Sequence, residues 1–294
     1  MESFLNSKSK REKGKLWLLL FAFLACFAGN VFGQNLDVLA EKIRTGSTEQ
    51  KRDALFQLRN LETAEASRIA IPALQDSNEI VRVTATYSII YLPSDEAAQV
   101  LLPLLQDKSP FVRKETCYAL GKTKNPLAVQ PLLEILQKDK FPEVKVASVI
   151  ALGEIGEVGA IDFLLKILQN NPKDSEVFLR RSAARSIGQI AQIQQIKLSY
   201  VVTPESLLPE KYDTFANLKY SNLAETNSSF QKSVSVLLSI LKNEKESDDV
   251  RREAAFALGT IGDKSVIANL QNNLSAKDYY LAEICKEGLA KISK

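Results

Sequence analysis

The sequence lacks histidine altogether, and its single methionine is residue 1. Histidine provides the general base, the metal ligand or the haem ligand in many enzymes, so every site that depends on an imidazole is excluded. This one absence removes most classes of enzyme. The remaining composition, with 45% hydrophobic and 25% charged residues in a chain of 294, is that of a globular protein that can bury a full-sized core.

Cysteine is also scarce, with three residues at positions 26, 117 and 285. An exported protein that keeps the last two is a candidate for a disulfide. The repeat described below, however, places Cys117 and Cys285 four units apart, and the Cα atoms of a disulfide lie within about 7 Å of each other. We therefore expect two buried free thiols.

The N-terminal segment has the features of an export signal. Basic residues at positions 8–15 precede an apolar run, and small residues end it at Gly33, so cleavage would leave a mature chain that begins at Gln34. Such a chain would reside in the periplasm or cell envelope, or be secreted. The apolar run covers the 17 residues 16–32, whereas a membrane-spanning helix needs about 20. An uncleaved membrane anchor through residues 16–32, or lipid attachment at Cys26, is the alternative.

Positive charge is concentrated in this same segment. Residues 1–33 contain five Lys or Arg and two Glu, a net charge of +3, and the whole chain, with 38 basic and 35 acidic residues, also has a net charge of +3. Residues 34–294 are therefore neutral overall. A neutral chain has no general field that attracts nucleic acid, so we expect no nucleic-acid partner.

A short pattern recurs along the rest of the chain. With the first residue of each copy numbered as position 0, the pattern has an apolar residue at position 0, a basic residue at position 1 and a small residue at position 4. The triplet Ala-Leu-Gly follows at positions 7 to 9. The copies begin at Gln50, Val81, Val112, Val144, Leu179, Val250 and Leu281, and most are 31 to 35 residues apart. The apolar and small positions form one face of a helix. Each copy is therefore predicted to be a helix with one face in the core.

A second apolar stretch precedes each copy, and a few polar residues with helix-start chemistry join the two. Each repeat is therefore predicted to be a helical hairpin, which cannot bury both faces alone and must stack on its neighbours. The sequence predicts an all-α fold, a right-handed α-α superhelix (α-solenoid) of about seven helical hairpins. The hairpins are expected at residues 34–61, 62–92, 93–124, 125–156, 157–192, 231–262 and 263–294.

The sequence resembles the HEAT family, in particular the short HEAT-like repeats of the phycobilin-lyase type. The resemblance is carried by the Ala-Leu-Gly triplets at 119–121, 151–153 and 257–259, and by an acid in each turn with a base six residues later. These pairs are Asp76 with Arg82, Asp107 with Arg113, Asp139 with Lys145, and Asp174 with Arg180. The resemblance covers most of residues 34–294. It implies that these acids and bases form a hydrogen-bonded ladder between neighbouring repeats.

A binding surface is predicted on the concave face of such a solenoid. The second helices of the hairpins line this face, and positions 2 and 6 of the pattern point away from the core. The residues at these positions are Val83, Tyr87, Lys114, Tyr118, Val146, Ile150, Arg181, Arg185, Arg252 and Phe256, followed by Glu283 and Glu287. Exposed aromatic and arginine side chains are typical of protein interfaces. The alternative is that the aromatic rings tilt sideways and seal adjacent repeats.

Residues 193–230 break the pattern and form a non-repeat insertion of 38 residues. Long segments of this kind in compact folds are often functional. The aromatic residues that make this one a candidate for contact with a partner are Tyr200, Tyr212, Phe215 and Tyr220. A decorative loop or an embellished repeat is the alternative.

Two functions are compatible with these observations. The first is an exported, non-catalytic scaffold that binds a protein or peptide along its concave face, without a cofactor or metal. The second is a lyase-like or other enzyme accessory protein, because relatives of the HEAT-like type include chromophore lyases and a di-iron hydroxylase. The hydroxylase site is built from His-Glu pairs, which this chain cannot supply.

Overall fold

The computed structural model describes residues 36–199 and 220–293, and within these ranges the secondary structure is entirely helical. The all-α fold class predicted from the repeat is therefore confirmed. The chain divides into two compact units, residues 1–92 and 93–294. The signal segment, and with it the choice between cleavage and a membrane anchor, lies outside the described residues.

The first unit contains two helical hairpins. Residues 36–45 form a helix that pairs with α2 (Thr48–Asn60), and α3 (Ala64–Ala70), continued by η1 (Ile71–Gln75), pairs with α4 (Glu79–Ser88). Side chains at the apolar and small positions of the pattern are buried, among them Ala54 in α2 and Ala85 in α4. The small side chain repeated at this position lets α2 and α4 pack against each other.

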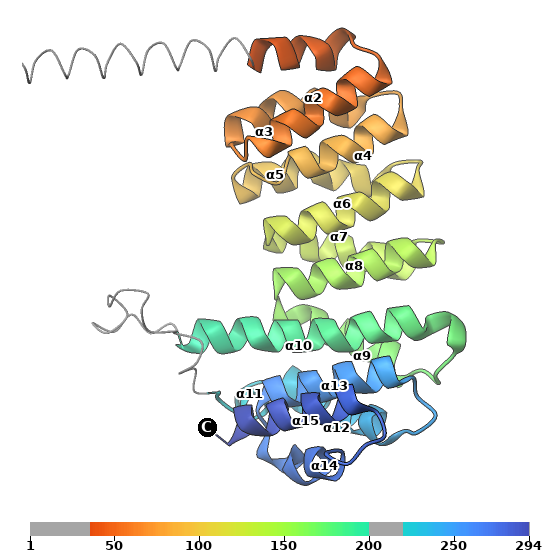
Figure 1. The fold of residues 1–294 in the computed structure, drawn as a ribbon, viewed down its shortest axis with the longest axis vertical. Helices are drawn as coiled ribbons and strands as arrows, with labels where there is room; N and C mark the ends of the chain where they lie inside the picture. The colour runs from red at the N-terminus through yellow and green to blue at the C-terminus, as the bar shows by residue number, and fades with distance from the viewer. Residues whose placement is uncertain (1–35, 200–219, 294) are drawn as a thin grey trace, which may run out of the picture. The chain divides into compact units, whose positions relative to one another are not determined.

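The second unit contains five hairpins, and Figure 1 shows their second helices side by side. The first helices and the short 3-10 helices beside them are α5 (Ser94–Leu101) with η2 (Leu102–Gln106), η3 (Pro126–Ala128) with α7 (Val129–Lys138), η4 (Val158–Ala160) with α9 (Ile161–Gln169), α11 (Leu223–Thr226) with α12 (Ser228–Lys242), and η7 (Lys264–Val266) with α14 (Ile267–Asn272). The second helices are α6 (Pro110–Thr123), α8 (Pro142–Ile155), α10 (Val177–Ser199), preceded by η5 (Asp174–Glu176), α13 (Asp248–Ile261) and α15 (Tyr279–Ile292).

Glycine in the Ala-Leu-Gly triplets allows adjacent second helices to approach closely. A Cβ atom at Gly121 of α6 would lie 2.9 Å from the Cα atom of Ala151 in α8. A Cβ atom at Gly259 of α13 would lie 2.5 Å from the Cα atom of Gly288 in α15. No carbon atom fits at these distances, so the triplet ends in glycine because the neighbouring backbone occupies the space.

The insertion is shorter than the sequence suggested. Residues 193–199 continue α10, which is 23 residues long, and residues 223–230 belong to α11 and the first turn of α12. Buried side chains at both ends, including Phe230, account for the difference, because they extend the helical pattern into the predicted insertion. Cys117 and Cys285 are free and buried, as the repeat spacing predicted.

Candidate binding surface

Neighbouring hairpins are joined through the basic residue of the pattern. In the second unit, Arg113 donates to the carboxylate of Asp139, from Nε to Oδ2 at 2.7 Å and from Nη2 to Oδ1 at 3.1 Å, and its Nη1 donates to the carbonyl of Asp107 at 2.8 Å. In the first unit, Lys51 donates to Asp76 at 2.7 Å. The base of one hairpin thus binds the turn acid of the next.

The fifth hairpin differs from the expected pairing of Arg180 with Asp174. Arg180 donates to the carbonyls of Asn170 at 2.8 Å and Ile167 at 3.0 Å, and its Nε and Nη2 contact the carboxylate of Glu246. Asp174 is exposed in η5. The turn before α10 is longer than the others, so the residue six positions before the base is no longer the turn acid. Glu246, in the turn before α13, is the turn acid of the next hairpin, as Asp139 is for Arg113.

Arg82 and Lys145 occupy the same position of the pattern in α4 and α8. Arg82 is buried and donates to the carbonyls of Asp76 at 2.8 Å and Ser77 at 3.1 Å. Lys145 is half-buried and has no ion-pair partner among the residues that the structure describes. The carboxylate of Asp139, which the sequence paired with Lys145, accepts from Arg113 instead. Lys145 lines a pocket, described below.

In the first unit, the predicted groove residues Val83 and Tyr87 are half-buried in α4. The guanidinium carbon of Arg59, at the end of α2, lies 5.2 Å from the centre of the Tyr87 ring. A cation–π contact of this kind joins the two second helices of the unit. Tyr87 thus contacts the adjacent repeat, as the alternative interpretation of the aromatic positions expects.

Two predicted groove arginines of α10 face acids of α13. The shortest N···O distance is 3.0 Å between Arg185 and Glu253, and 3.6 Å between Arg181 and Asp249. Burial raises the pKa of Glu253, although the nearby Arg185 opposes the shift. The positive charge of these two predicted groove residues is thus partly neutralised by the acids of α13.

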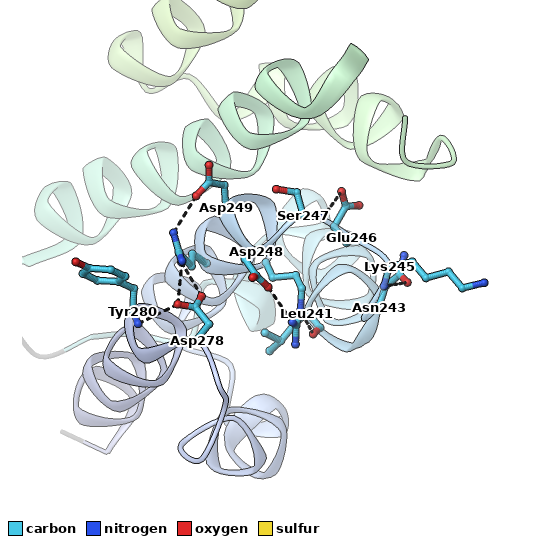
Figure 2. A network of polar contacts seen from close by, with 11 residues as sticks. Leu241, Asn243, Lys245, Glu246, Ser247, Asp248, Asp249, Asp278 and Tyr280 are labelled. Atoms are coloured by element: carbon cyan, nitrogen blue, oxygen red, sulfur yellow. Dashed lines mark hydrogen bonds and ion pairs between the residues drawn. The ribbon is translucent and has the colours of Figure 1, made fainter. Parts of the chain in front are cut away.

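Arg252 of α13 binds two acids, Asp249 of its own helix and Asp278 at the start of α15, both of which are labelled in Figure 2. Its Nε and Nη2 donate to Asp278 at 2.6 and 2.9 Å, and its Nη1 donates to Asp249 at 2.9 Å. Asp278 also accepts from the backbone N–H of Tyr280 at 3.1 Å and is the N-cap of α15. The Arg252 hydrogen bonds hold the pKa of Asp278 below its usual value. This predicted partner-binding residue therefore joins two helices.

Phe256 of α13 also packs against its neighbours. A Cβ atom at Gly188 of α10 would lie 2.5 Å from the Phe256 ring, and the Lys291 ammonium lies 5.2 Å from the centre of that ring. Burial lowers the pKa of Lys291. Phe256 and Lys291, with Glu253 and others, line a small pocket of 200 Å³ between α10, α13 and α15.

A row of exposed aromatic rings lies at the starts of the second helices in the second unit. Phe111 of α6, Phe178 of α10 and Tyr280 of α15 are 61%, 68% and 65% exposed, and Phe141, the N-cap of α8, is 41% exposed. We call these four residues the aromatic edge. Three of them lie one position before the pattern begins, a recurrence visible in the sequence. Positions 2 and 6 do not include these rings, so the groove predicted from the sequence lacks them.

Each ring of the aromatic edge has a cation over it. The pairs, with the distance from the cation to the ring centre, are Lys114 over Phe111 (4.5 Å), Arg113 over Phe141 (5.5 Å), Arg181 over Phe178 (5.6 Å) and Arg252 over Tyr280 (5.2 Å). Such contacts are worth about 0.5–1 kcal/mol at exposed sites. The cations thus help to hold the rings in place, although the rings remain 41% to 68% exposed.

A pocket of 670 Å³ in the second unit lies between α6, α8 and α10. Three lysines, Lys114, Lys140 and Lys145, line it, and we call it the lysine pocket. Its apolar wall is formed by Tyr118, Pro142, Val146, Phe178 and Leu179, and Glu143, Ser175 and Glu176 complete the lining. Three predicted groove residues, Lys114, Tyr118 and Val146, are therefore brought together. Ile150, one turn after Val146 in α8, is half-buried and does not line this pocket.

Of the predicted residues in the insertion, Tyr200, Tyr212 and Phe215 lie outside the described residues. Tyr220 is half-buried, with the Lys291 ammonium 5.8 Å from its ring centre. Next to it, Ser221 is fixed to α10 by Gln195, whose side chain donates to the Ser221 carbonyl at 2.7 Å and accepts from the Ser221 N–H at 3.0 Å. The C-terminal end of the predicted insertion is therefore anchored to the repeats.

Among residues 36–199 and 220–293, no group of three or more Cys, Asp or Glu side chains is arranged to hold a metal ion. Burial raises the pKa of Tyr118, so its hydroxyl remains a hydrogen-bond donor at neutral pH. Within the same ranges, no helix is both long and apolar enough to cross a membrane.

Comparison with protein families matches residues 67–145 and 129–198 to HEAT repeats, and residues 250–276 to the PBS lyase HEAT-like repeat. The chain is a HEAT-repeat protein. The pattern recognised in the sequence, with its turn acids and Ala-Leu-Gly triplets, is therefore the HEAT pattern. No curated protein matches the sequence.

Two solved structures have similar folds. Human deoxyhypusine hydroxylase in complex with glycerol is 18% identical, over 90% of this HEAT-repeat chain and 98% of its own, with a TM-score of 0.40. The complex of CpcE and CpcF of phycocyanin lyase from a Nostoc species is 18% identical, over 87% of this chain and 94% of its own, with a TM-score of 0.46.

Proposed function

We propose that this HEAT-repeat protein is an exported, non-catalytic scaffold that binds a protein or peptide partner along the second helices of its second unit. The observation that carries the proposal is the aromatic edge. Its rings are 41% to 68% exposed, although large aromatic side chains are normally covered in a soluble protein. Exposed aromatic residues beside arginine and lysine are typical of protein-binding surfaces.

The fold itself does not require these rings. Neighbouring hairpins are already joined by Arg113 with Asp139, by Arg252 with Asp278 and by the closely packed glycines. Each ring of the aromatic edge stands at the first turn of a helix, outside the buried face, and contributes little to the core. Their recurrence in four of the five hairpins of the unit therefore favours contact with a partner.

Export is supported by the N-terminal sequence alone. A basic stretch, an apolar run of 17 residues and a small-residue end are the features by which signal peptides are recognised. The scaffold would then meet its partner in the periplasm, in the cell envelope or outside the cell.

Site-specific photocrosslinking tests the binding surface. A photoreactive benzoylphenylalanine is placed at Phe178, or at Phe111, in the full-length chain in its own cells. We expect one protein to be crosslinked at both positions. The matched control is Leu127, which is 59% exposed in η3, a few residues after the opposite end of α6, a helix about 20 Å long. Identical adducts at Leu127, or no protein adduct at the aromatic edge, would show that this edge is not the binding surface.

A further inference from the structure

We propose that the lysine pocket receives an acidic segment of the partner, in which an Asp or Glu side chain lies next to an apolar one. The carboxylate would bind Lys140 and Lys145, and the apolar side chain would pack against Tyr118, Val146 and Phe178. This inference rests on the proposed function and deepens it, because it specifies the chemistry of the partner.

The charges of the pocket are unevenly compensated. Lys114 pairs with Glu115 at 3.1 Å, and Glu176 pairs with Lys173 at 3.5 Å, so these two lining residues are already neutralised. Lys140 and Lys145 have no ion-pair partner among the residues that the structure describes, and only Glu143 of the lining opposes them. The pocket therefore has an excess of positive charge, which a carboxylate complements.

Lys145 gives the strongest indication of an anionic ligand. It occupies the position that is a ladder base in other hairpins, yet no acid of the next turn, before α10, forms an ion pair with it, and Asp174 of that turn is exposed. Lys145 is half-buried and lines the pocket. A partly buried ammonium without a counter-charge is unfavourable, and a carboxylate in the pocket would relieve that cost. The first turns of α8 and α10 line the same pocket and add partial positive charge.

The apolar wall explains why the anion should belong to a protein. Tyr118, Val146 and Phe178 form a surface for an aliphatic or aromatic side chain beside the lysines. A nucleic-acid strand instead needs a series of free cations for its phosphates. Here the three arginines over rings of the aromatic edge are each paired with an acid, and residues 34–294 have no net charge. The pairs are Arg113 with Asp139, Arg181 with Asp249, and Arg252 with Asp278. An acidic protein segment fits these observations better.

Selection from a displayed library of short random peptides on the full-length protein provides the test. We expect enrichment of peptides with Asp or Glu within two positions of an aromatic residue or leucine. The affinity of one such peptide is then compared with that of its Asn/Gln counterpart by fluorescence anisotropy. We expect the acidic peptide to bind about tenfold more tightly than its Asn/Gln counterpart, which is the gain that two partly exposed ion pairs would give. High salt should reduce this difference in affinity, because it screens the charges.

Two variants make the assignment specific. The double variant Lys140→Gln, Lys145→Gln should abolish this tenfold difference while leaving the affinity for the Asn/Gln peptide unchanged. The matched control, Lys138→Gln with Lys166→Gln, removes the same charge from the exposed sides of α7 and α9 and should retain the difference. Circular dichroism establishes that both variants are folded.

Four outcomes would overturn the inference. These are enrichment of neutral or basic peptides, no enrichment at all, an acidic preference that persists in the Lys140, Lys145 variant, or displacement of the peptide by an oligothymidylate that needs the same two lysines. The first three leave the proposed function intact if Phe178 still crosslinks a protein. If acidic peptides are enriched but Phe178 crosslinks no protein, the pocket would bind free acidic peptides and the proposed protein partner would be wrong.

Discussion

At the scale of single residues, the buried pair of Arg180 and Glu246 has the clearest energetic consequence. Their side chains are 1% and 0% exposed, and they join α10 to the turn before α13. Removing one member of a buried ion pair leaves an uncompensated charge and costs about 3–5 kcal/mol. We therefore expect Glu246→Gln to lower the free energy of unfolding of the second unit by about 3 kcal/mol, measured by urea denaturation.

The exposed residue Glu244 provides the control, because Glu244→Gln makes the same chemical change two positions away. An exposed substitution of this kind changes stability by about 0.5 kcal/mol or less. Equal losses in the two variants would mean that the buried pair contributes nothing specific. A double variant in which apolar residues replace both Arg180 and Glu246 should lose less than Glu246→Gln, because no charge remains buried.

Asp278 determines part of the response to acid. Its hydrogen bonds with Arg252 hold its pKa below the usual value. A carboxyl group whose pKa is lower in the folded chain stabilises the fold above its unfolded pKa of about 3.9, and this contribution is lost as the pH falls through the folded pKa. The stability difference between wild type and Asp278→Asn should therefore be constant above about pH 5 and shrink below about pH 4. A difference that persists unchanged at lower pH would contradict this role.

The Arg180 pairing also shows what the sequence did not reveal at this scale. The spacing of six residues correctly identified the turn acid wherever the turn had its usual length, as for Asp107 and Asp139. Before α10 the turn is longer, so the same spacing of six residues led to Asp174, which does not pair with Arg180. Glu246 is 66 positions from Arg180, across a segment outside the repeat, and no local pattern connects the two.

At the scale of helices, close approach between α13 and α15 depends on Gly259. Because a Cβ atom there would lie 2.5 Å from the Cα of Gly288, Gly259→Ala must push the two backbones apart. Overpacking of this kind costs about 1–3 kcal/mol. We expect that loss in thermal or urea unfolding. Gly159→Ala is the control, because no atom lies within 4 Å of its added Cβ, and it should be neutral or slightly stabilising.

Helix positions could be predicted from the sequence because apolar and small residues recur with the helical period. The polar residues with helix-start chemistry that join the helices of a hairpin include Asn78, Ser109 and Ser247, and these are the N-caps of α4, α6 and α13. The predicted insertion was too long because Gln195 is polar and interrupts the apolar pattern. Its side chain is nonetheless buried, where it donates to the carbonyls of Ser221 and Thr260. A buried polar anchor cannot be distinguished from a loop residue by hydrophobicity.

The binding surface was predicted less well than the helices, again for a physical reason. Positions 2 and 6 do face away from the core, but neighbouring helices are close enough to cover them, so Arg252 and Phe256 contact α15 or its turn. Residues such as Phe178, at the first turn, extend beyond the adjacent helix and remain exposed. Exposure at a helix start depends on the stacking of hairpins, which a single helical wheel does not include.

At the scale of the whole molecule, the proposed export predicts a change of charge. The full chain has a net charge of +3 and an isoelectric point of 8.6, whereas residues 34–294 contain equal numbers of basic and acidic residues. Because the basic residues of the signal are removed with it, the mature protein should focus at about pH 7 rather than at 8.6.

Isoelectric focusing of the protein isolated from its own cells, followed by sequencing of its N-terminus, tests this prediction. Processing at the expected site gives a chain that begins at Gln34 and focuses near neutrality. A chain that keeps residue 1 and focuses near 8.6 would mean that residues 16–32 are retained, and detergent dependence would then identify them as an anchor. In both cases the lysine pocket keeps its local excess of charge, because no residue that lines it belongs to the N-terminal segment. Binding of an acidic peptide should therefore be the same for the processed and unprocessed chains.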